Sequence, residues 1–305
     1  MFTIGTDPEF ILTDKNKFVS AISKFPSPSQ PITKNKNKFY YDNVMVEIQI
    51  KEAKDKKEFI TNIGSAIYDL SKLAFPLEIS PNSSCVFDED QLKHPDARVI
   101  GCNAEYCAYE LRILSQPHNI IKNTGFRSAG GHIHLGSKSL CENGYDIIHV
   151  TRSLDLFLGI PSLFLDKTTG NKDRRKIYGK AGSHRITDYG LEYRPLSNFW
   201  LFSPELCGFV YEICDFVLEF VKTKKYLELW KVDQKILEKS DDPSKAYFCT
   251  AYNIEDFRSC IDASDKLKAK HFLKIVKKYL PSDIFTQIKQ LAKTNLDLKS
   301  NWGLS

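Results

Sequence analysis

The chain has 305 residues, 42% hydrophobic and 27% charged, which is ample for one large domain or for one domain with an appended helical part. Its net charge of +5 is small, because 43 Lys and Arg residues are nearly balanced by 38 Asp and Glu residues, and this argues against a simple nucleic-acid binder. Asp7 and Glu9 interrupt the first apolar residues, so we expect no signal peptide. The longest apolar run, Leu156 to Leu165, is too short to span a bilayer. We therefore expect a cytoplasmic protein that does not enter a membrane.

The cysteines and arginines are used selectively. The eight cysteines form no CxxC pair and no zinc-ribbon spacing, so we interpret them as small hydrophobic residues of a reduced protein. Eight of the nine arginines lie between Arg98 and Arg194, whereas the C-terminal third uses lysine. Because arginine presents a planar, bidentate fork, this concentration favours a phosphate or carboxylate ligand in the central region.

The N-terminal part predicts two strands and a helix. Phe2 to Leu12 reads as a strand in which Asp7 and Glu9 share a face, and Pro8 restricts it to a sheet edge or to its own first residues. A loop is expected from Phe25 to Lys38. Tyr40 to Ile50 alternates as a single strand with Glu47 and Gln49 on one face, and Lys54 to Ala74 has the spacing of an amphipathic helix.

The middle of the chain predicts extended segments, a helix and a loop. Their expected bounds are Leu77–Phe87 and Val99–Leu114 for the extended segments, Glu142–Phe157 for a helix that ends near Pro161, and Lys167–Arg185 for the loop.

A short apolar strand centred on two histidines lies between these segments. His132 and His134 are two residues apart, so in a strand their side chains point the same way. Histidine is a common metal ligand and proton carrier, and glycines at 130, 131 and 136 allow a close approach of ligand or backbone.

The chain becomes helical after residue 200. Gly190 to Arg194 is a last short strand, with Glu192 and Arg194 on one face. Ser203-Pro204-Glu205 has the pattern of a helix start, and the helix should reach Val221. Further helices are expected after Ser264 and Ser282, and we interpret the lysines in the first of them as a solvated face.

Four predicted strands thus carry polar pairs at i and i+2, and their chemistry is unusual. The pairs are Asp7/Glu9, Glu47/Gln49, His132/His134 and Glu192/Arg194. Any one pair would fit a solvated strand of a half-exposed sheet. Together, carboxylates on one face would repel each other unless cations lie between them, and oxygen-rich sites with one imidazole suit Mg²⁺ or Mn²⁺ better than zinc. With nearby arginines this set suits phosphoryl transfer, although the chain has no Walker-type or dinucleotide glycine motif.

Five motifs carry a family resemblance. They are Gly5-Thr6-Asp7-Pro8-Glu9-Phe10, Asp42 to Glu47, Gly130 to Gly136, Tyr178-Gly179-Lys180-Ala181-Gly182 with Arg185, and Tyr189 to Asn198. In this order, over residues 1 to 200, they resemble the phage-type carboxylate–amine ligases of the glutamine synthetase-like superfamily. The resemblance implies an α+β fold, with a curved antiparallel sheet that forms a funnel flanked by helices. It also implies a catalytic core at residues 1–200 and a helical part at residues 201–305 packed on that core.

The resemblance also implies roles for individual residues. ATP and two or more Mg²⁺ ions, or Mn²⁺, would be held with metal ligands at Asp7, Glu9, Glu47, His132 and Glu192. Arg194 would contact phosphate or the acyl intermediate, and His134 would face nucleotide phosphate or substrate. Arg175 and Arg185 would contact the phosphates, with Arg174 as an alternative to Arg175. The roles of Cys102 and Glu105 stay open.

The resulting hypothesis is an ATP-dependent ligase that joins a carboxylate to an amine through an acyl phosphate. Its substrates would be small molecules or peptides, and we expect a monomer or dimer in the cytoplasm of an infected cell. A phosphotransferase of the same fold and a non-catalytic metal- or nucleotide-binding protein are the alternatives. A cysteine-dependent enzyme that uses Cys102 with His132 is a further one.

Overall fold

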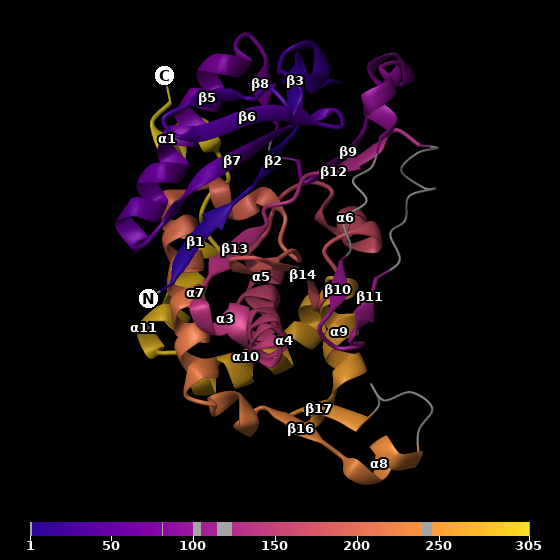
Figure 1. Cartoon of the computed structure of the whole chain (residues 1–305), viewed down its shortest axis with the longest axis vertical. Coiled ribbons are helices and arrows are strands. Elements are labelled where there is room, and N and C mark those ends of the chain that lie inside the picture. Colours follow the sequence, from indigo (N-terminus) through magenta and orange to yellow (C-terminus); the bar gives the residue numbers. More distant parts are fainter. Residues whose placement is uncertain (1, 81, 100–104, 115–123, 240–245, 305) are drawn as a thin grey trace.

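The computed structural model describes residues 2–80, 82–99, 105–114, 124–239 and 246–304, and it is built on one large antiparallel sheet with helices packed against it (Figure 1). Within the described residues ten strands form this sheet, in the order β11-β10-β14-β15-β13-β1-β7-β6-β5, and β2 also pairs with β7. Every pairing in the sheet is antiparallel. The fold is therefore of the mixed α+β class that the sequence predicts.

The strands of this sheet come from three stretches of the chain. The first supplies β1 (Thr3–Thr6), β2 (Glu9–Phe10), β5 (Ile32–Lys34), β6 (Asn37–Asp42) and β7 (Met45–Ala53). The others supply β10 (Tyr106–Cys107), β11 (Arg112–Ile113), β13 (Ile133–Gly136), β14 (Ser183–Thr187) and β15 (Gly190–Tyr193). Smaller sheets are formed by β3 (Leu12–Asp14), β4 (Lys17–Val19) and β8 (Glu78–Ile79), and by β9 (Ser84–Val86) with β12 (Phe126–Ser128).

The helices gather mainly below and beside the sheet in Figure 1. The earlier ones are α1 (Lys56–Ala74), α3 (Lys138–Glu142), α4 (Gly144–Leu154), α5 (Ile160–Leu165) and α6 (Asn171–Ile177). The later ones are α7 (Pro204–Lys222), α8 (Gln234–Lys239), α9 (Ile254–Asp262), α10 (Lys266–Tyr279), α11 (Ser282–Leu291) and α12 (Leu298–Trp302). Helix α1 follows its prediction closely, begins at an Asp55 cap, and packs against β7 and α7. Val46, Ile48 and Ile50 of β7 point into the core, which leaves Glu47 on the opposite face.

The segment predicted as one strand, Tyr40 to Ile50, is instead a hairpin. Strand β6 ends at Asp42, Asn43 adopts a left-handed conformation with φ 55°, and β7 begins at Met45. Asparagine tolerates this conformation better than most residues, so the turn is locally encoded. The hairpin places Tyr40 directly opposite Glu47 and pairs Asp42 with Met45.

The first strand is also shorter and more central than predicted. It stops at Thr6 and resumes as β2 at Glu9, so Pro8 falls in the interruption where no ladder N–H is needed. The carbonyl of Pro8 still accepts from the Ile48 amide at 3.0 Å. Strand β1 lies between β13 and β7, in the interior of the sheet and not at an edge.

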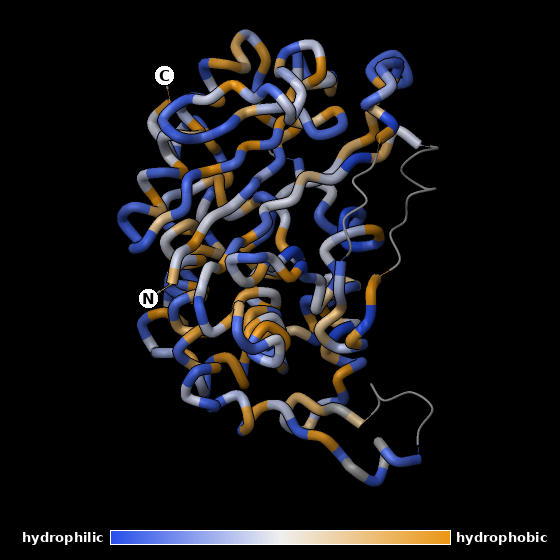
Figure 2. Tube along the Cα trace, viewed as in Figure 1, coloured by the Kyte–Doolittle hydropathy of each residue, from blue (hydrophilic) through white to orange (hydrophobic). Residues whose placement is uncertain are grey.

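The predicted helix that should end near Pro161 continues through it. A π-helical turn, Asp155–Gly159, joins α4 to α5. The stretch Gly144–Leu165 is long and apolar enough to cross a membrane, yet 83% of its apolar window is buried inside the protein. Many residues of this stretch are hydrophobic and belong to the hydrophobic core (Figure 2), as expected of a core helix.

Two other expectations need correction. The segment Lys167–Arg185, expected to be a loop, contains helix α6 and most of strand β14. The extended segments predicted for Leu77–Phe87 and Val99–Leu114 hold only two-residue and three-residue strands in their described parts, and short helical turns at Glu89–Leu92 and Pro95–Arg98 lie between the two segments.

The C-terminal region is helical, as predicted, but with additions. Helix α7 begins at the expected Ser203 cap, and the helices expected after Ser264 and Ser282 have Asp265 and Pro281 at their N-cap positions. Helix α9 and a three-stranded sheet of β16 (Trp230–Val232), β17 (Tyr247–Cys249) and β18 (Tyr252–Asn253) were not predicted. The division into residues 1–200 and 201–305 stays a prediction, and side chains from both parts share one hydrophobic core.

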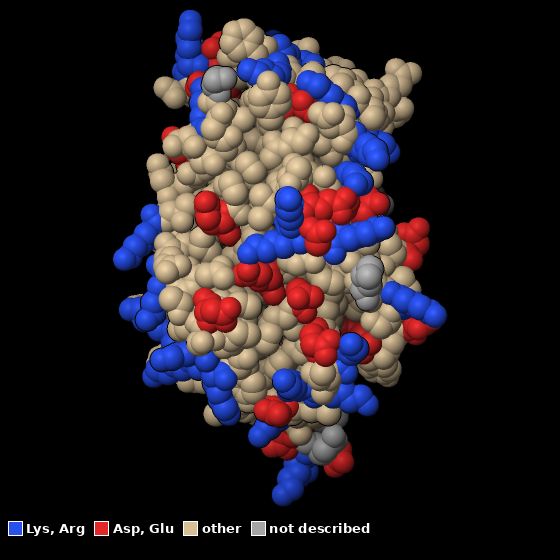
Figure 3. All heavy atoms as spheres, turned by 90° about the vertical axis from the view of Figure 1, so that its left-hand side faces the viewer, with Lys and Arg blue, Asp and Glu red and all other residues tan. Residues whose placement is uncertain are grey.

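The surface in Figure 3 carries positive and negative side chains interspersed over one face. This distribution agrees with the modest net charge of +5. It provides no broad positive field on that face for a polyanion.

Candidate active site

The five predicted metal ligands fall into two neighbouring groups. Asp7, His132 and Glu192 form the first cluster, and Glu9, Asp42 and Glu47 form the second. Within each cluster, one ligand atom from each of the three residues lies within 4.8 Å of the others. Each cluster therefore has the spacing needed to hold one cation.

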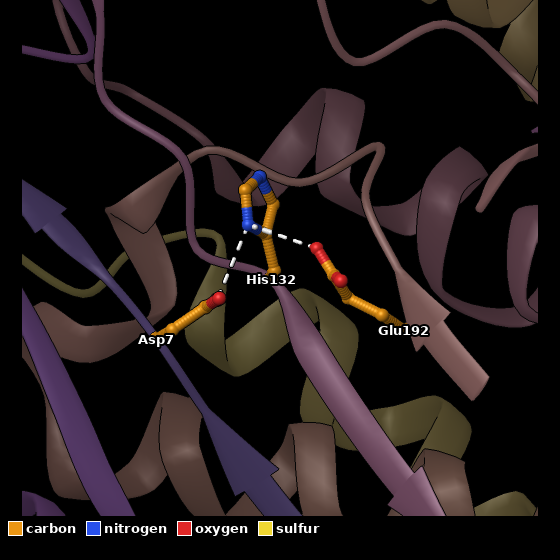
Figure 4. A group of neighbouring side chains, drawn as sticks. All are labelled: Asp7, His132 and Glu192. Atoms are coloured by element: carbon orange, nitrogen blue, oxygen red, sulfur yellow. Dashed lines mark hydrogen bonds and ion pairs between the residues drawn. The ribbon is translucent and has the colours of Figure 1, made fainter. Parts of the chain in front are cut away.

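The first cluster is centred on the imidazole of His132 (Figure 4). Its Nδ1 lies 3.2 Å from Asp7 Oδ1 and 3.5 Å from Glu192 Oε1. Three adjacent strands position these side chains, since Asp7 follows β1, His132 precedes β13 and Glu192 lies in β15. Tertiary pairing thus joins residues that are far apart in the sequence.

Two glycines explain how His132 reaches this position. A Cβ on Gly130 would lie 2.6 Å from His132 Nε2, and one on Gly131 would lie 2.6 Å from the Ser197 carbonyl oxygen. The Trp200 indole N–H donates to the Gly131 carbonyl oxygen at 3.1 Å. The glycines therefore serve the close backbone packing behind the histidine.

Arginines surround the carboxylate of Glu192. Arg194 donates from Nη1 to Glu192 Oε1, and Arg185 Nη1 lies 3.4 Å from the same oxygen. Arg194 Nη1 also lies 3.3 Å from His132 Nδ1, and its Nε lies 3.7 Å from Glu105 Oε1. The first cluster is therefore an alternation of positive and negative groups.

The second cluster contains only carboxylates as charged members. Glu9 and Glu47 face each other in the β2–β7 pairing. The Gly130 amide donates to Glu9 Oε2 at 2.6 Å, and the Tyr40 hydroxyl donates to Glu47 Oε1 at 2.6 Å. These donors orient two carboxylates without adding a positive charge.

The pKa shifts of the two clusters differ in direction. In the first, burial would raise the pKa of Asp7, but the imidazoles of His134 and His132 lower it below its usual range. Burial likewise opposes the shift at Glu192, whose pKa is lowered by His132 and Arg194. The imidazoles beside Asp7, and the imidazole and guanidinium groups beside Glu192, thus favour the ionised form of both acids.

In the second cluster every acid has a raised pKa. Burial and the Asp42 carboxylate raise the pKa of Glu9 to about 7. Burial and Asp7 raise the pKa of Asp42, and burial with Asp7 and Asp42 raises that of Glu47 well above its usual value. A divalent cation would supply the missing positive charge, so these oxygen ligands fit Mg²⁺ or Mn²⁺.

A pocket opens beside both clusters. Its lining includes acids, arginines and apolar groups, among them Glu9, Asp42, Glu105, His132, Arg174, Arg185, Arg194, Met45, Val99, Phe126 and Tyr178. Arg174 and Arg185 each have a buried Nε that lacks a hydrogen-bond partner within the described part of the chain. Buried N–H groups of this kind fit an anionic ligand such as a phosphate.

The structure distinguishes the two adjacent arginines of α6. Arg175, the residue preferred for phosphate contact, turns away from the pocket and donates to Ser162 Oγ at 3.0 Å. Arg174 lines the pocket and donates to the Pro195 carbonyl oxygen at 2.9 Å. Consecutive side chains on a helix point about 100° apart, so only one of them faces the site. Of the two arginines considered for phosphate contact, Arg174 is therefore the one that lines the pocket.

The positions of several residues differ from what the sequence predicts or leaves open. Asp42 was not among the predicted ligands, although it begins a quoted motif, because the hairpin that places it was read as one strand. Glu105 is buried in the pocket wall beside Arg194. His134 does not line the pocket, and its Nε2 lies 3.0 Å from Asp7 Oδ1. Cys102 lies outside the described residues.

Comparison with known proteins gives a family. The sequence model described as phage phiEco32-like COOH.NH2 ligase-type 2 matches residues 121–304. The chain belongs to this family. The match includes His132, Arg174, Arg185 and Glu192 of the COOH.NH2 ligase, and the second cluster lies before it. The family supports an enzyme that joins a carboxylate to an amine.

One solved structure resembles the ligase weakly. It is the bifunctional glutathione synthetase from Pasteurella multocida, with 13% identity and a TM-score of 0.39 over 99% of this chain and 48% of the other. The chain therefore spans about half the length of that protein, and a likeness at this level carries no argument about its reaction. No curated protein sequence matches the chain.

Proposed function

We propose that this protein is an ATP- and magnesium-dependent carboxylate–amine ligase with a glutamine synthetase-like catalytic sheet. The observation that carries the proposal is the pair of three-residue clusters beside one arginine-lined pocket. Two cation sites next to buried arginines match what transfer of a phosphoryl group to a carboxylate requires. The resulting acyl phosphate would react with an amine, whose nitrogen would form the amide bond to the acyl carbon while the carbon–oxygen bond to phosphate breaks and inorganic phosphate and a proton leave.

The residues divide this work by position. Asp7, His132 and Glu192 would hold one Mg²⁺, and Glu9, Asp42 and Glu47 a second. Bound cations would offset phosphate charge and orient the reacting groups. Arg174, Arg185 and Arg194 line the pocket and would contact phosphate oxygens with their guanidinium N–H groups.

The family favours a ligase over a phosphotransferase, which would use the same cations. The two differ in products, because a phosphotransferase releases ADP and a stable phosphorylated product without any amine. Small-molecule or peptide substrates and action in the cytoplasm of an infected cell are part of the proposal.

The first test needs no knowledge of the substrates. Thermal unfolding is followed with Mg²⁺ and ATP together and with each alone, in the wild type and in Glu9→Gln. A ligand at about 100 times its dissociation constant adds roughly 2.7 kcal/mol to stability. We expect Mg²⁺ and ATP together to raise the melting temperature by more than the sum of the two rises measured separately, and we expect this excess to be lost in Glu9→Gln.

Glu52→Gln is the matched control, because Glu52 is an exposed glutamate on β7, outside both clusters. It should keep the wild-type rise. Absence of any rise in the wild type would contradict the proposal, and a rise would justify a screen of carboxylates and amines for ADP release.

A further inference from the structure

Glu105 is a buried acid in the wall of the pocket, and neither cluster includes it. Among the described residues that line the pocket, the other acids are Glu9 and Asp42, and both belong to the second cluster. A carboxylate whose charge is offset by a bound cation attracts a positively charged substrate only weakly. Glu105 is therefore the acid of the pocket wall that remains for a task other than metal binding.

The backbone holds Glu105 at one side of the large sheet. The residue directly precedes β10, which pairs with β11 on one side and with β14 on the other. Its carbonyl oxygen accepts from the Leu114 amide at 2.7 Å. These contacts fix the point from which the side chain of Glu105 reaches the pocket wall.

One guanidinium group separates Glu105 from the first cluster. Arg194 Nε lies 3.7 Å from Glu105 Oε1, a distance at which the two groups attract each other without a hydrogen bond between them. Nη1 of the same arginine donates to Glu192 Oε1 and lies 3.3 Å from His132 Nδ1. A phosphate held by Arg194 and by a cation of the first cluster would therefore lie close to Glu105.

The charges of the pocket suit only one of the two expected substrates without Glu105. Arg174, Arg185 and Arg194 line the pocket, and their guanidinium groups would attract a phosphate but repel an ammonium ion. An alkyl amine is an ammonium ion at neutral pH, so its approach to these arginines requires an anionic partner. The hydroxyl of Tyr178 does not supply one, because burial raises its pKa.

We propose that Glu105 binds the ammonium group of the amine substrate and takes one of its protons. This inference rests on the acyl phosphate of the proposed function and adds the chemical class of the acceptor, an amine that arrives as a cation. Loss of that proton frees the nitrogen lone pair, which forms the bond to the acyl carbon as the carbon–oxygen bond to phosphate breaks. The departing phosphate takes a second proton from the nitrogen, and Glu105 releases the first to solvent.

The test compares a charged nucleophile with an uncharged one. Hydroxylamine is mainly uncharged at neutral pH, so it attacks an acyl phosphate without an ammonium site, and its hydroxamate product is detected by its colour with iron(III). The wild type is given Mg²⁺, ATP and hydroxylamine with each standard amino acid and with small dicarboxylic acids. Every acid that yields hydroxamate is then assayed for amide formation with ammonium, methylamine, putrescine and L-lysine.

Glu105→Gln keeps the size of the side chain but removes its charge and its ability to take a proton. We expect amide formation from these amines to fall by about 100-fold or more, with a raised KM for the amine, while hydroxamate formation stays nearly unchanged. Glu105→Asp keeps a carboxylate and should recover part of the amide formation. Glu142→Gln, at an exposed glutamate of α3 outside the pocket, is the matched control and should leave both products unchanged.

The outcomes separate this inference from the proposed function. Equal losses of amide and hydroxamate in Glu105→Gln would make the residue only a structural partner of Arg194 and would overturn the inference. Unchanged amide formation in that variant would also overturn it, as would a wild type that makes hydroxamate but no amide from these amines. Absence of hydroxamate in the wild type with every acid would contradict the acyl phosphate of the proposed function itself, and the inference with it.

Discussion

The two clusters are neighbours, but they differ in how the negative charge of their buried carboxylates is compensated. Asp7 and Glu192 are paired with histidines and arginines, and their pKa values are lowered. In the second cluster, neutral groups donate hydrogen bonds to Glu9 and Glu47, and the nearest charged groups are other carboxylates. Its three acids, Glu9, Asp42 and Glu47, therefore have raised pKa values. The negative charge of the first cluster is therefore offset by other side chains of the protein. The negative charge of the second cluster can be offset only by bound protons or by bound cations.

The largest expected contrast is in the stability of the metal-free protein. Glu192→Gln removes the partner of Arg194, which is only 9% exposed, and should cost about 3 kcal/mol because a buried charge loses its counter-ion. Glu9→Gln removes a carboxyl whose charge is already disfavoured, so stability should change by less than about 1 kcal/mol, or rise. Urea unfolding in EDTA measures both, and equal losses would mean that the clusters do not differ.

The next contrast is in pH dependence. The folded protein keeps the Glu9 proton up to about pH 7, whereas the unfolded chain loses it near 4.5. The contribution of Glu9 to metal-free stability should thus fall by about 3 kcal/mol as pH rises between these values, and level off above pH 7. Asp7 and Glu192 have lowered pKa values, so their contribution is instead lost as the solution is acidified below their usual values.

Urea unfolding in EDTA from pH 3 to pH 8 checks both limbs. Glu9→Gln should flatten the decline between pH 5 and pH 7 without altering the acid limb. Saturating Mg²⁺ should reverse that decline, since cation binding to the second cluster requires its carboxyls to be ionised. A decline that persists in Glu9→Gln would assign it to other groups.

The smallest effect concerns an orienting hydrogen bond. Tyr40→Phe removes the hydroxyl that donates to Glu47 Oε1 and should weaken Mg²⁺ binding by several-fold, about 1 kcal/mol. Calorimetric titration with Mg²⁺ measures the loss. Tyr68→Phe, at an exposed tyrosine of α1, is the control, and an equal loss there would contradict a specific role of Tyr40.

Sequence alone predicted much of this site because strand alternation is local. The pairs at i and i+2 identified Asp7, Glu9, His132 and Glu192, and the structure brings them together. Their division between two clusters was not predictable, since it depends on which strands become neighbours. Their roles as ligands stay a prediction until a cation is measured.

The missed residues have particular physical reasons. Asp42 was not predicted as a ligand because the turn at Asn43 was not recognised. One left-handed residue there converts the apparent strand into a hairpin. Arg174 and Arg175 could not be separated while their segment was taken for a loop, because only a helix fixes which of two consecutive side chains faces inward. Glu105 has no periodic signal, and its position depends on the fold around it.

The π-helical turn at Asp155–Gly159 determines how α5 meets its neighbours. Its extra residue shifts the rotational phase of α5 by about 100° relative to an uninterrupted α-helix. In that phase Ser162 accepts from Arg175. The Asp155 carboxylate lies below the sheet and accepts from Tyr193 and the Gly182 amide. Tyr193 stands between Glu192 and Arg194 in the chain, so the alignment of these two residues is set partly by the Asp155 side chain at the start of the π-helical turn.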